Sequence, residues 1–213
     1  MLLVLSPNPL PDGEDGSAAM ESLTDMMASA GCGELHMLHI EEFKTSSFLW
    51  PLLLEFRLPP EADEQVRSQR VGGLRKYIME HCGWLASGSP RFLWLRQTGF
   101  GVEHDGADLI VSLYSWQEST SAPERERHMW DHFDLERQES DYTAVHFNVS
   151  TGQEHFDNGE FDFVFQAYVD DPEGLSRIYA SPRLEMMREH SRRFLDTDTR
   201  RLGFGRVRIV NLS

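Results

Sequence analysis

The sequence predicts an α+β protein in which two consecutive repeats, each of the order strand–helix–strand–strand–helix–strand (βαββαβ), form one barrel within a single chain. Short apolar runs alternate with segments of helical periodicity, and this order starts again near residue 108. Two pairs of similar segments lie about half a chain apart, as a tandem duplication requires. The length of 213 residues is enough for a large core without disulfide or metal support.

The first repeat contains four predicted strands and two predicted helices. In SAAMESLTDMMASA the apolar residues recur at helical spacing, and glycines follow them. Pro51 restricts its strand to an edge or a bulge, because proline has no N–H to donate to a neighbouring strand. The strands are expected at residues 1–5, 34–43, 47–58 and 91–99, and the helices at residues 17–30 and from the Pro59–Pro60 pair to about residue 83.

The second repeat has the same order of elements. DLIVSLYSW and FDFVFQAYV are apolar runs of strand length, and a charged amphipathic helix follows the first of them. A break is expected in the last helix at Ser181–Pro182, because proline disfavours the helical conformation in the residue before it. The strands are expected at residues 108–116, 142–150, 161–169 and 204–210, and the helices at residues 123–139 and 171–201.

Two alignments support the duplication. LLEFRLPPE, which ends at Glu61, matches FQAYVDDPE, which ends 112 positions later at Glu173. HMLHIEEF around His39 matches YTAVHFNV around His146, at an offset of 107. The difference between the offsets requires an insertion in the second repeat, which the polar segment 151–160 supplies.

The repeats are assigned to residues 1–102 and 107–213. A βαββαβ unit places both helices on one face of a four-stranded sheet and leaves the other face apolar, so that face must be covered. Two such sheets stacked face to face cover each other and enclose a cavity. We therefore expect a monomer that is a pseudo-dimer internally, and a homodimer is left open.

The charge excludes two classes of partner. The formal net charge is −15, with 35 acidic and 20 basic residues. Nucleic-acid binding and anionic membrane surfaces both require clustered basic residues. The two cysteines form no CxxC pair, which suits a reducing compartment. The N-terminal apolar run is too short for a signal peptide, and no apolar run is long enough for a membrane helix. We expect a soluble, cytoplasmic protein.

The segment after residue 160 contains an aromatic strand that leads into a helix with a Ser-Pro pair and a later RFxDxxR sequence. This pattern resembles the EthD-like proteins of the ferredoxin-like dimeric α+β barrel superfamily. The resemblance implies a ferredoxin-like fold for each repeat and one of the superfamily's activities, which include cyclases, decarboxylases, cofactor-free monooxygenases, lactone isomerases and haem enzymes. The matching residues are Phe163, Phe165, Tyr168, Ser181, Pro182, Arg193, Phe194, Asp196 and Arg200.

The sequence departs from this family at one histidine. The family pattern has a tryptophan and, a few residues later, a histidine near the end of the first helix of a repeat. In HMWDHFDLE the tryptophan is Trp130, but the family's histidine would fall near Asp134. His128 and His132 lie nearby, out of step with that position.

Strand alternation selects candidate site residues, because ligands of such barrels are expected between the sheets. The mixed polar faces of three strands of the second repeat are expected to share one volume. We predict His146 as a general base, with Tyr168 beside it as a second catalytic residue that holds a developing oxyanion. The predicted substrate-binding residues are Gln166, Asn148, Ser112, Tyr114 and Trp116.

The first repeat and the last strand are expected to place their polar side chains at the surface. His39, Glu55 and Arg57 are interpreted as exposed residues of a proline-interrupted strand. Arg206 and Arg208 are interpreted as solvated charges of an edge strand.

No metal and no cofactor are expected. His128 and His132 are four apart on a helix and share a face, but the intervening sequence is not HExxH and no third ligand is in register. The chain also lacks the GxGxxG and GxxxxGK[ST] sequences that bind phosphates.

The function predicted is that of a cofactor-independent small-molecule enzyme of polyketide or aromatic tailoring, a cyclase, dehydratase or decarboxylase that transfers protons in the barrel cavity. Two alternatives remain open. One is a cofactor-free monooxygenase acting on a phenolic substrate. The other is a non-catalytic barrel that binds a small molecule.

Overall fold

The computed structural model describes residues 1–41, 49–58, 64–139, 141–151, 161–171 and 173–211. The first half contains β1 (Leu2–Ser6), α1 (Gly13–Ala30), β2 (Glu34–Glu41), β3 (Leu52–Arg57), α2 (Glu64–His81), α3 (Gly83–Ala86) and β4 (Arg91–Gly101). The second half contains β5 (Asp108–Trp116), α4 (Ala122–Glu136), β6 (Ala144–Ser150), β7 (Phe163–Val169), α5 (Gly174–Ala180), α6 (Pro182–Ser191) and β8 (Leu195–Asn211).

All eight strands form one closed antiparallel barrel in the order β1-β3-β2-β8-β5-β7-β6-β4. This confirms the predicted α+β fold class. The expectation of two separate stacked sheets is wrong, because β4 pairs with β6 and β8 pairs with β2, which joins the halves edge to edge. Strands β4 and β8 have 11 and 17 residues, so each continues past its own half and pairs with the edge of the other.

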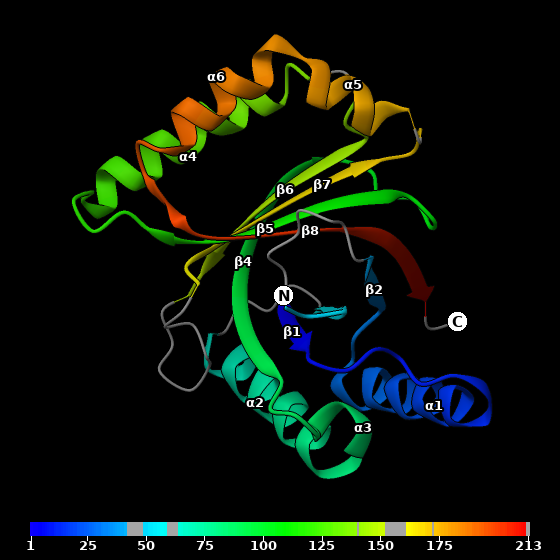
Figure 1. The fold of residues 1–213 in the computed structure, drawn as a ribbon. Coiled ribbons are helices and arrows are strands. Elements are labelled where there is room, and N and C mark those ends of the chain that lie inside the picture. The colour runs from blue at the N-terminus through cyan, green and yellow to red at the C-terminus, as the bar shows by residue number, and fades with distance from the viewer. Residues whose placement is uncertain (42–48, 59–63, 140, 152–160, 172, 212–213) are drawn as a thin grey trace.

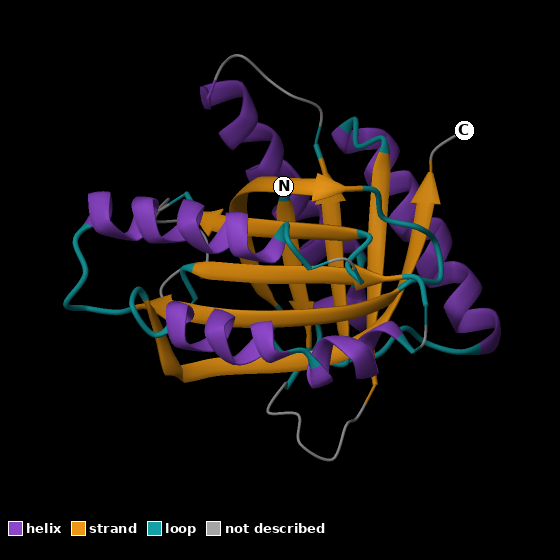
Figure 2. Cartoon of the chain, turned by 90° about the horizontal axis from the view of Figure 1, so that it is seen from above, coloured by secondary structure: helices purple, strands orange, loops and turns teal. Residues whose placement is uncertain are grey.

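The helices form two layers on opposite outer sides of the barrel (Figure 1). Helices α1, α2 and α3 cover the first half, and α4, α5 and α6 cover the second. From above, the strands of the barrel run in two crossed directions (Figure 2). Three apolar clusters follow from this arrangement: one under each helical layer and one inside the barrel. None of the helices in the described ranges combines the length and apolarity needed to span a membrane.

The end of the second half differs from the sequence prediction. The break in the last helix is confirmed: α5 ends at Ala180, and the Ser181 hydroxyl accepts a hydrogen bond from the Arg183 N–H at 3.3 Å at the start of α6. The prediction of helix up to residue 201 is wrong, because β8 starts at Leu195 and pairs with β5. Pairing with a strand distant in sequence decides this segment, and local periodicity does not report such pairing.

Strand β3 also differs from expectation. It lies between β1 and β2 in the barrel, so it is not an edge strand. Pro51 comes before the strand, and its carbonyl accepts a hydrogen bond from the Ile40 N–H at 2.9 Å. The predicted parts of this strand before residue 49, the helix start at Pro59–Pro60, the insertion at 152–160 and Pro172 lie outside the described residues.

The strand pairings change the alignment of the two halves. In the first half His36 lies opposite Glu55, and in the second half His146 lies opposite Gln166. His36, and not His39, therefore occupies the position equivalent to His146. The offset is then 110 between His36 and His146 and 111 between Glu55 and Gln166. The two offsets differ by one residue instead of five.

Candidate functional site

The polar residues predicted on β6 and β7 point into the barrel. His146, Asn148, Gln166 and Tyr168 alternate with residues of the cluster under the helices, and Tyr168 itself belongs to the interior cluster. His146 pairs directly with Gln166, and their neighbours continue this register along the two strands. The structure therefore brings these four predicted site residues together, on the face that strand alternation assigned to them.

A carboxylate from the first half lies at the centre of this interior group. Glu55 is fully buried, and its carboxylate accepts hydrogen bonds from Arg57 Nε at 2.8 Å and from Gln166 Nε2 at 2.9 Å. Burial by itself raises the pKa of Glu55, but Arg57, His36 and His146, together with the Gln166 hydrogen bond, lower it overall. The expectation that Glu55 and Arg57 lie on an exposed face is wrong, because closure of the barrel turns that face inward.

Both ring nitrogens of His146 have partners in this group. Nδ1 lies 2.9 Å from Gln97 Nε2, and Nε2 lies 2.8 Å from Glu103 Oε1. Glu103 also pairs with Arg57 at 2.5 Å. Burial raises the pKa of Glu103, while its hydrogen bonds from His146 and Arg57 lower the pKa well below its usual value. An amide donor on Nδ1 leaves the proton on Nε2, where it is donated to Glu103.

Tyr168 is fully buried beside this network, with its ring centroid 5.4 Å from that of His146. Its hydroxyl has no hydrogen-bond partner among the described residues. Burial raises the pKa of Tyr168 well above its usual value, and the nearby charges of Glu55 and Glu103 raise it further. The phenol is therefore neutral at physiological pH.

The placement predicted for Ser112, Tyr114 and Trp116 is wrong. Strand β5 directs Leu109, Val111 and Leu113 into the barrel, so the alternate residues face the helical layer. Alternation separates the apolar face of β5 from its mixed face, but it does not tell which of the two turns inward; here the wholly apolar face does, unlike on β6 and β7. The three residues consequently belong to a different region from His146.

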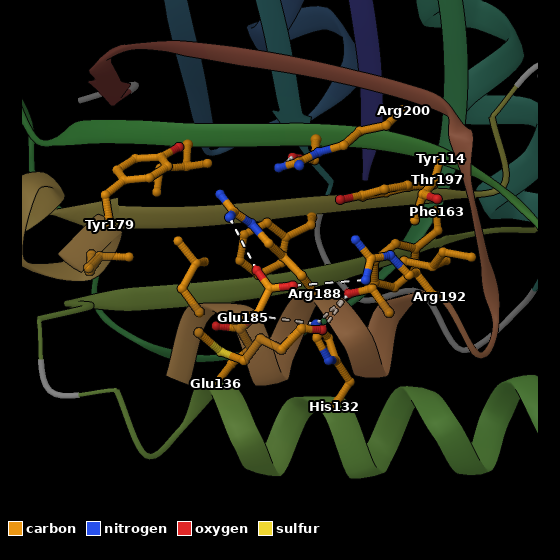
Figure 3. Close-up of a pocket in the computed structure, with 18 of the residues that line it drawn as sticks. Tyr114, His132, Glu136, Phe163, Tyr179, Glu185, Arg188, Arg192, Thr197 and Arg200 are labelled. Atoms are coloured by element: carbon orange, nitrogen blue, oxygen red, sulfur yellow. Dashed lines mark hydrogen bonds and ion pairs between the residues drawn. The ribbon is translucent and has the colours of Figure 1, made fainter. Parts of the chain in front are cut away.

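Ser112 and Tyr114 line a cavity of about 350 Å³ between the outer face of the second-half strands and the helices α4, α5 and α6 (Figure 3). Strand residues form one wall, and residues from the helices form the other. The lining residues are Ile110, Ser112, Tyr114, His132, Glu136, Tyr142, Phe163, Phe165, Ile178, Tyr179, Leu184, Glu185, Met187, Arg188, Ser191, Arg192, Leu195, Thr197 and Arg200.

A histidine–glutamate pair from α4 lies on the helical wall. His132 Nε2 is 3.3 Å from Glu136 Oε1, and the Ser191 hydroxyl lies 3.4 Å from the same nitrogen. Glu136 is 4% exposed, and its Oε2 atom has no hydrogen-bond partner among the described residues. A buried carboxylate oxygen without a partner is costly unless a ligand or water satisfies it.

Two tyrosines lie close to this carboxylate. Burial raises the pKa of the Tyr142 hydroxyl, and so do the charge of Glu136 and a hydrogen bond to it. Burial also raises the pKa of Tyr114, where Arg200 and the Ser112 hydroxyl act in the opposite direction and Glu136 adds to the rise. The charges of Glu136 on the helical wall and of Arg200 on the strand wall therefore both act on the Tyr114 hydroxyl.

Arginines supply the positive charge of the cavity. The Arg200 guanidinium carbon lies 5.7 Å from the centroid of the Tyr114 ring, and its Nη2 atom donates to the Ser112 hydroxyl at 3.4 Å. Arg188 and Arg192 lie beside Glu185, at 3.6 Å and 3.9 Å, and both arginines are about half exposed. The lining therefore combines these three arginines with the carboxylates of Glu136 and Glu185.

Sequence reasoning missed Glu136 and treated Arg200 only as part of the family pattern. The available signal was the spacing of four between His132 and Glu136 on a helix whose apolar residues Met129 and Phe133 are buried. Trp116 is half-buried against Phe163 and Phe194 and does not line the cavity. Its predicted role in substrate binding stays a prediction.

Neither a family model nor a curated protein matches the chain. Solved structures match nearly its whole length. An anthrone oxidase-like protein has a TM-score of 0.63 at 9% identity, over 99% of this chain and 91% of its own. A candidate monooxygenase from Lactobacillus acidophilus has a TM-score of 0.57 at 8% identity, over 100% of this chain and 98% of its own. A candidate chlorite dismutase has a TM-score of 0.51 at 14% identity, over 97% of this chain and 93% of its own. The chain thus shares the dimeric α+β barrel fold with these proteins.

Proposed function

We propose that this protein is a cofactor-independent enzyme that binds an anionic phenolic or polyketide-like molecule in the second-half cavity and removes a proton from it. The observation that carries the proposal is Glu136, a buried carboxylate that lines the cavity with one oxygen lacking a partner among the described residues. Such an oxygen is a suitable proton acceptor when a substrate C–H or O–H group reaches it.

The opposite wall supplies the groups that stabilise the product of this step. When the proton moves from substrate to Glu136, the electron pair stays on the substrate as an enolate or phenolate. Arg200, with the hydroxyls of Ser112 and Tyr114, lies on the strand side of the cavity, where it can hold the developing negative oxygen. His132 on α4 and Tyr142, which comes just before β6, position the Glu136 carboxylate.

The fate of this anion distinguishes two reactions. Attack on a carbonyl of the same molecule, or loss of water or CO₂, would make the protein a cyclase, dehydratase or decarboxylase, as the resemblance to EthD-like proteins implies. Reaction of the anion with O₂ would make it a cofactor-free oxygenase. The similarity to an anthrone oxidase-like protein and to a candidate monooxygenase favours this second candidate.

The sequence also predicts a competing site, with His146 as the base, Tyr168, Gln166 and Asn148 around the substrate oxygen, and the ligand inside the barrel. We place Glu136 first because both nitrogens of His146 are already paired with protein groups. A base must have an unengaged lone pair within reach of the proton that it removes.

Anthrone is a suitable probe, because it has an acidic CH₂ group and an oxygen that becomes anionic. Its oxidation is balanced as anthrone plus O₂ giving anthraquinone plus water. Exchange of the CH₂ protons for deuterium without O₂ consumption supports proton transfer alone, and catalysed O₂ consumption supports the oxygenase. Binding without exchange or O₂ consumption supports the non-catalytic barrel and contradicts the enzyme proposal. Absence of binding by anthrone and by hydroxylated anthrones contradicts the assignment of the cavity.

A further inference from the structure

A cluster of three potential metal ligands lies where α4 packs against α6. His128 and Asp131 are three residues apart on α4 and share a face of that helix. His190 comes from the last turn of α6. One ligand atom from each of these residues lies within 4.8 Å of the other two. None of the three is among the groups that line the cavity, so this cluster is separate from the proposed site.

The two histidines have ring nitrogens that nothing in the described residues satisfies. The Nδ1 atoms of His128 and His190 are both buried and lack a hydrogen-bond partner there. His190 is 9% exposed, and its ring centroid lies 5.6 Å from that of His128 in an edge-on arrangement. Buried imidazole nitrogens normally have a partner, so two unpaired ones side by side indicate a missing ligand.

The chemistry of the donors indicates the type of ligand. Two imidazole nitrogens and one carboxylate oxygen form a donor set that suits zinc and related divalent transition metals.

We propose that His128, Asp131 and His190 bind one divalent transition-metal ion of the zinc type, which ties α4 to α6. Tetrahedral zinc with bonds of about 2.0–2.1 Å places its ligand atoms about 3.3 Å apart. The three atoms must therefore approach one another slightly, and the exposed Asp131 side chain has the freedom to do so. A water molecule would complete the coordination.

The ion would lie between the two helices α4 and α6 that form part of the helical wall of the cavity, which gives it a structural role there. The His132 ring stacks on that of His190, with centroids 5.4 Å apart and planes inclined by 5°. His132 in turn pairs with Glu136 on the cavity wall. An ion that holds His190 in place therefore supports the two helices that carry these cavity residues.

This inference reverses an expectation from the sequence. His128 and His132 share a helical face, but the missing third ligand argued against a metal. The structure provides it from α6, about sixty residues later in the chain. His132 contacts Glu136 and Ser191 through Nε2 and lies outside the group of ligand atoms within 4.8 Å of one another, so His128 and Asp131 are the ligands that we assign to α4.

The test is calorimetric titration of the chelator-treated full chain with Zn²⁺, together with the visible spectrum of the Co²⁺ form. We expect one ion per chain and the d–d absorption bands of a nitrogen- and oxygen-coordinated cobalt. Asp131→Asn and His190→Asn should each weaken Zn²⁺ binding at least tenfold and abolish the rise in melting temperature that Zn²⁺ produces in the parent.

Asp134→Asn is the matched control, because it removes the same charge from another exposed position of α4. It should bind Zn²⁺ like the parent, as should Glu136→Gln, which separates this site from the proposed function. Asp131 is exposed, so its variant is expected to fold normally. Failure of the parent to bind Zn²⁺, or unchanged binding by Asp131→Asn and His190→Asn, would overturn the proposal.

Discussion

The two helical layers cover their halves of the barrel in different ways. Helices α1 and α2 pack against the outer face of β1–β4 through apolar side chains. Figure 1 shows them on the outer side of the first half of the barrel. Helices α4, α5 and α6 cover a cavity whose lining combines charged groups such as Glu136 and Arg200 with aromatic and aliphatic side chains. The second half thus combines an apolar cluster with a ligand-sized cavity, and the proposed function places its site in that cavity.

A second contrast lies between the barrel interior and the cavity. Both contain a buried carboxylate, but the oxygens of Glu55 accept hydrogen bonds from Arg57 and Gln166. Glu136 has one oxygen without a partner among the described residues. A buried carboxylate with both oxygens paired rigidifies the core around it, while an unpaired carboxylate oxygen marks a place where a ligand is needed. The pairing of the interior is not complete, because the Tyr168 hydroxyl and Asn148 Oδ1 lack partners among the described residues. We therefore expect substitutions in the interior to change stability and substitutions in the cavity to change activity.

The largest effect expected is on turnover. Glu136→Gln keeps the shape of the side chain but removes the proton acceptor, which should lower the rate of anthrone deuterium exchange by about 10²–10⁴-fold. Its free energy of unfolding should change by less than about 1 kcal/mol. The matched variant is His146→Ala, which should keep turnover within tenfold of the parent. If instead His146→Ala loses 10²-fold or more and Glu136→Gln does not, the base lies in the barrel, as the sequence alone predicts.

The next effect is on stability. Glu55→Ala leaves the Gln166 amide without its acceptor and Arg57 with Glu103 as its remaining carboxylate, and breaking a buried charge pair costs about 3–5 kcal/mol. Urea denaturation of the parent and the variant measures this difference. Glu80→Ala is the control, since Glu80 is exposed and pairs with Lys76 at 3.8 Å on α2, which is a surface ion pair. Equal stability of the Glu55 and Glu80 variants would show that the interior network does not hold the barrel together.

A smaller loss of stability is expected at Gly99, which faces His146 across β4 and β6. A Cβ atom there would lie 2.3 Å from His146 Cδ2 and 2.7 Å from the Val145 carbonyl oxygen. Gly99→Ala should cost about 1–3 kcal/mol, because the backbone and the imidazole must move apart. Gly72→Ala in α2, where nothing lies within 4 Å of the added Cβ, should be neutral or stabilising. Thermal unfolding of both variants makes the comparison, and a stable Gly99→Ala protein would mean that the interior is loosely packed.

Local patterns were sufficient for much of the fold. The apolar runs, the helical spacing of Leu23, Met26 and Met27, and the Ser181–Pro182 break are all properties of neighbouring residues. Period-two alternation also placed His146, Gln166 and Tyr168 on one face, because β6 and β7 have one mixed face and one apolar face. The same rule failed on β5, where the apolar face turns into the barrel and the mixed face lies under the helices.

The sequence by itself determined the α+β class, the repeated order of elements and the interior faces of β6 and β7, since these depend on the periodicity of short segments. Only the tertiary structure decided that Glu55 meets Gln166, 111 residues later, and that His190 meets His128. It also decided that residues 195–201 form a strand and that the cavity lies under α4, α5 and α6. Each of these depends on contacts between segments that closure of the barrel brings together, and no local pattern encodes them.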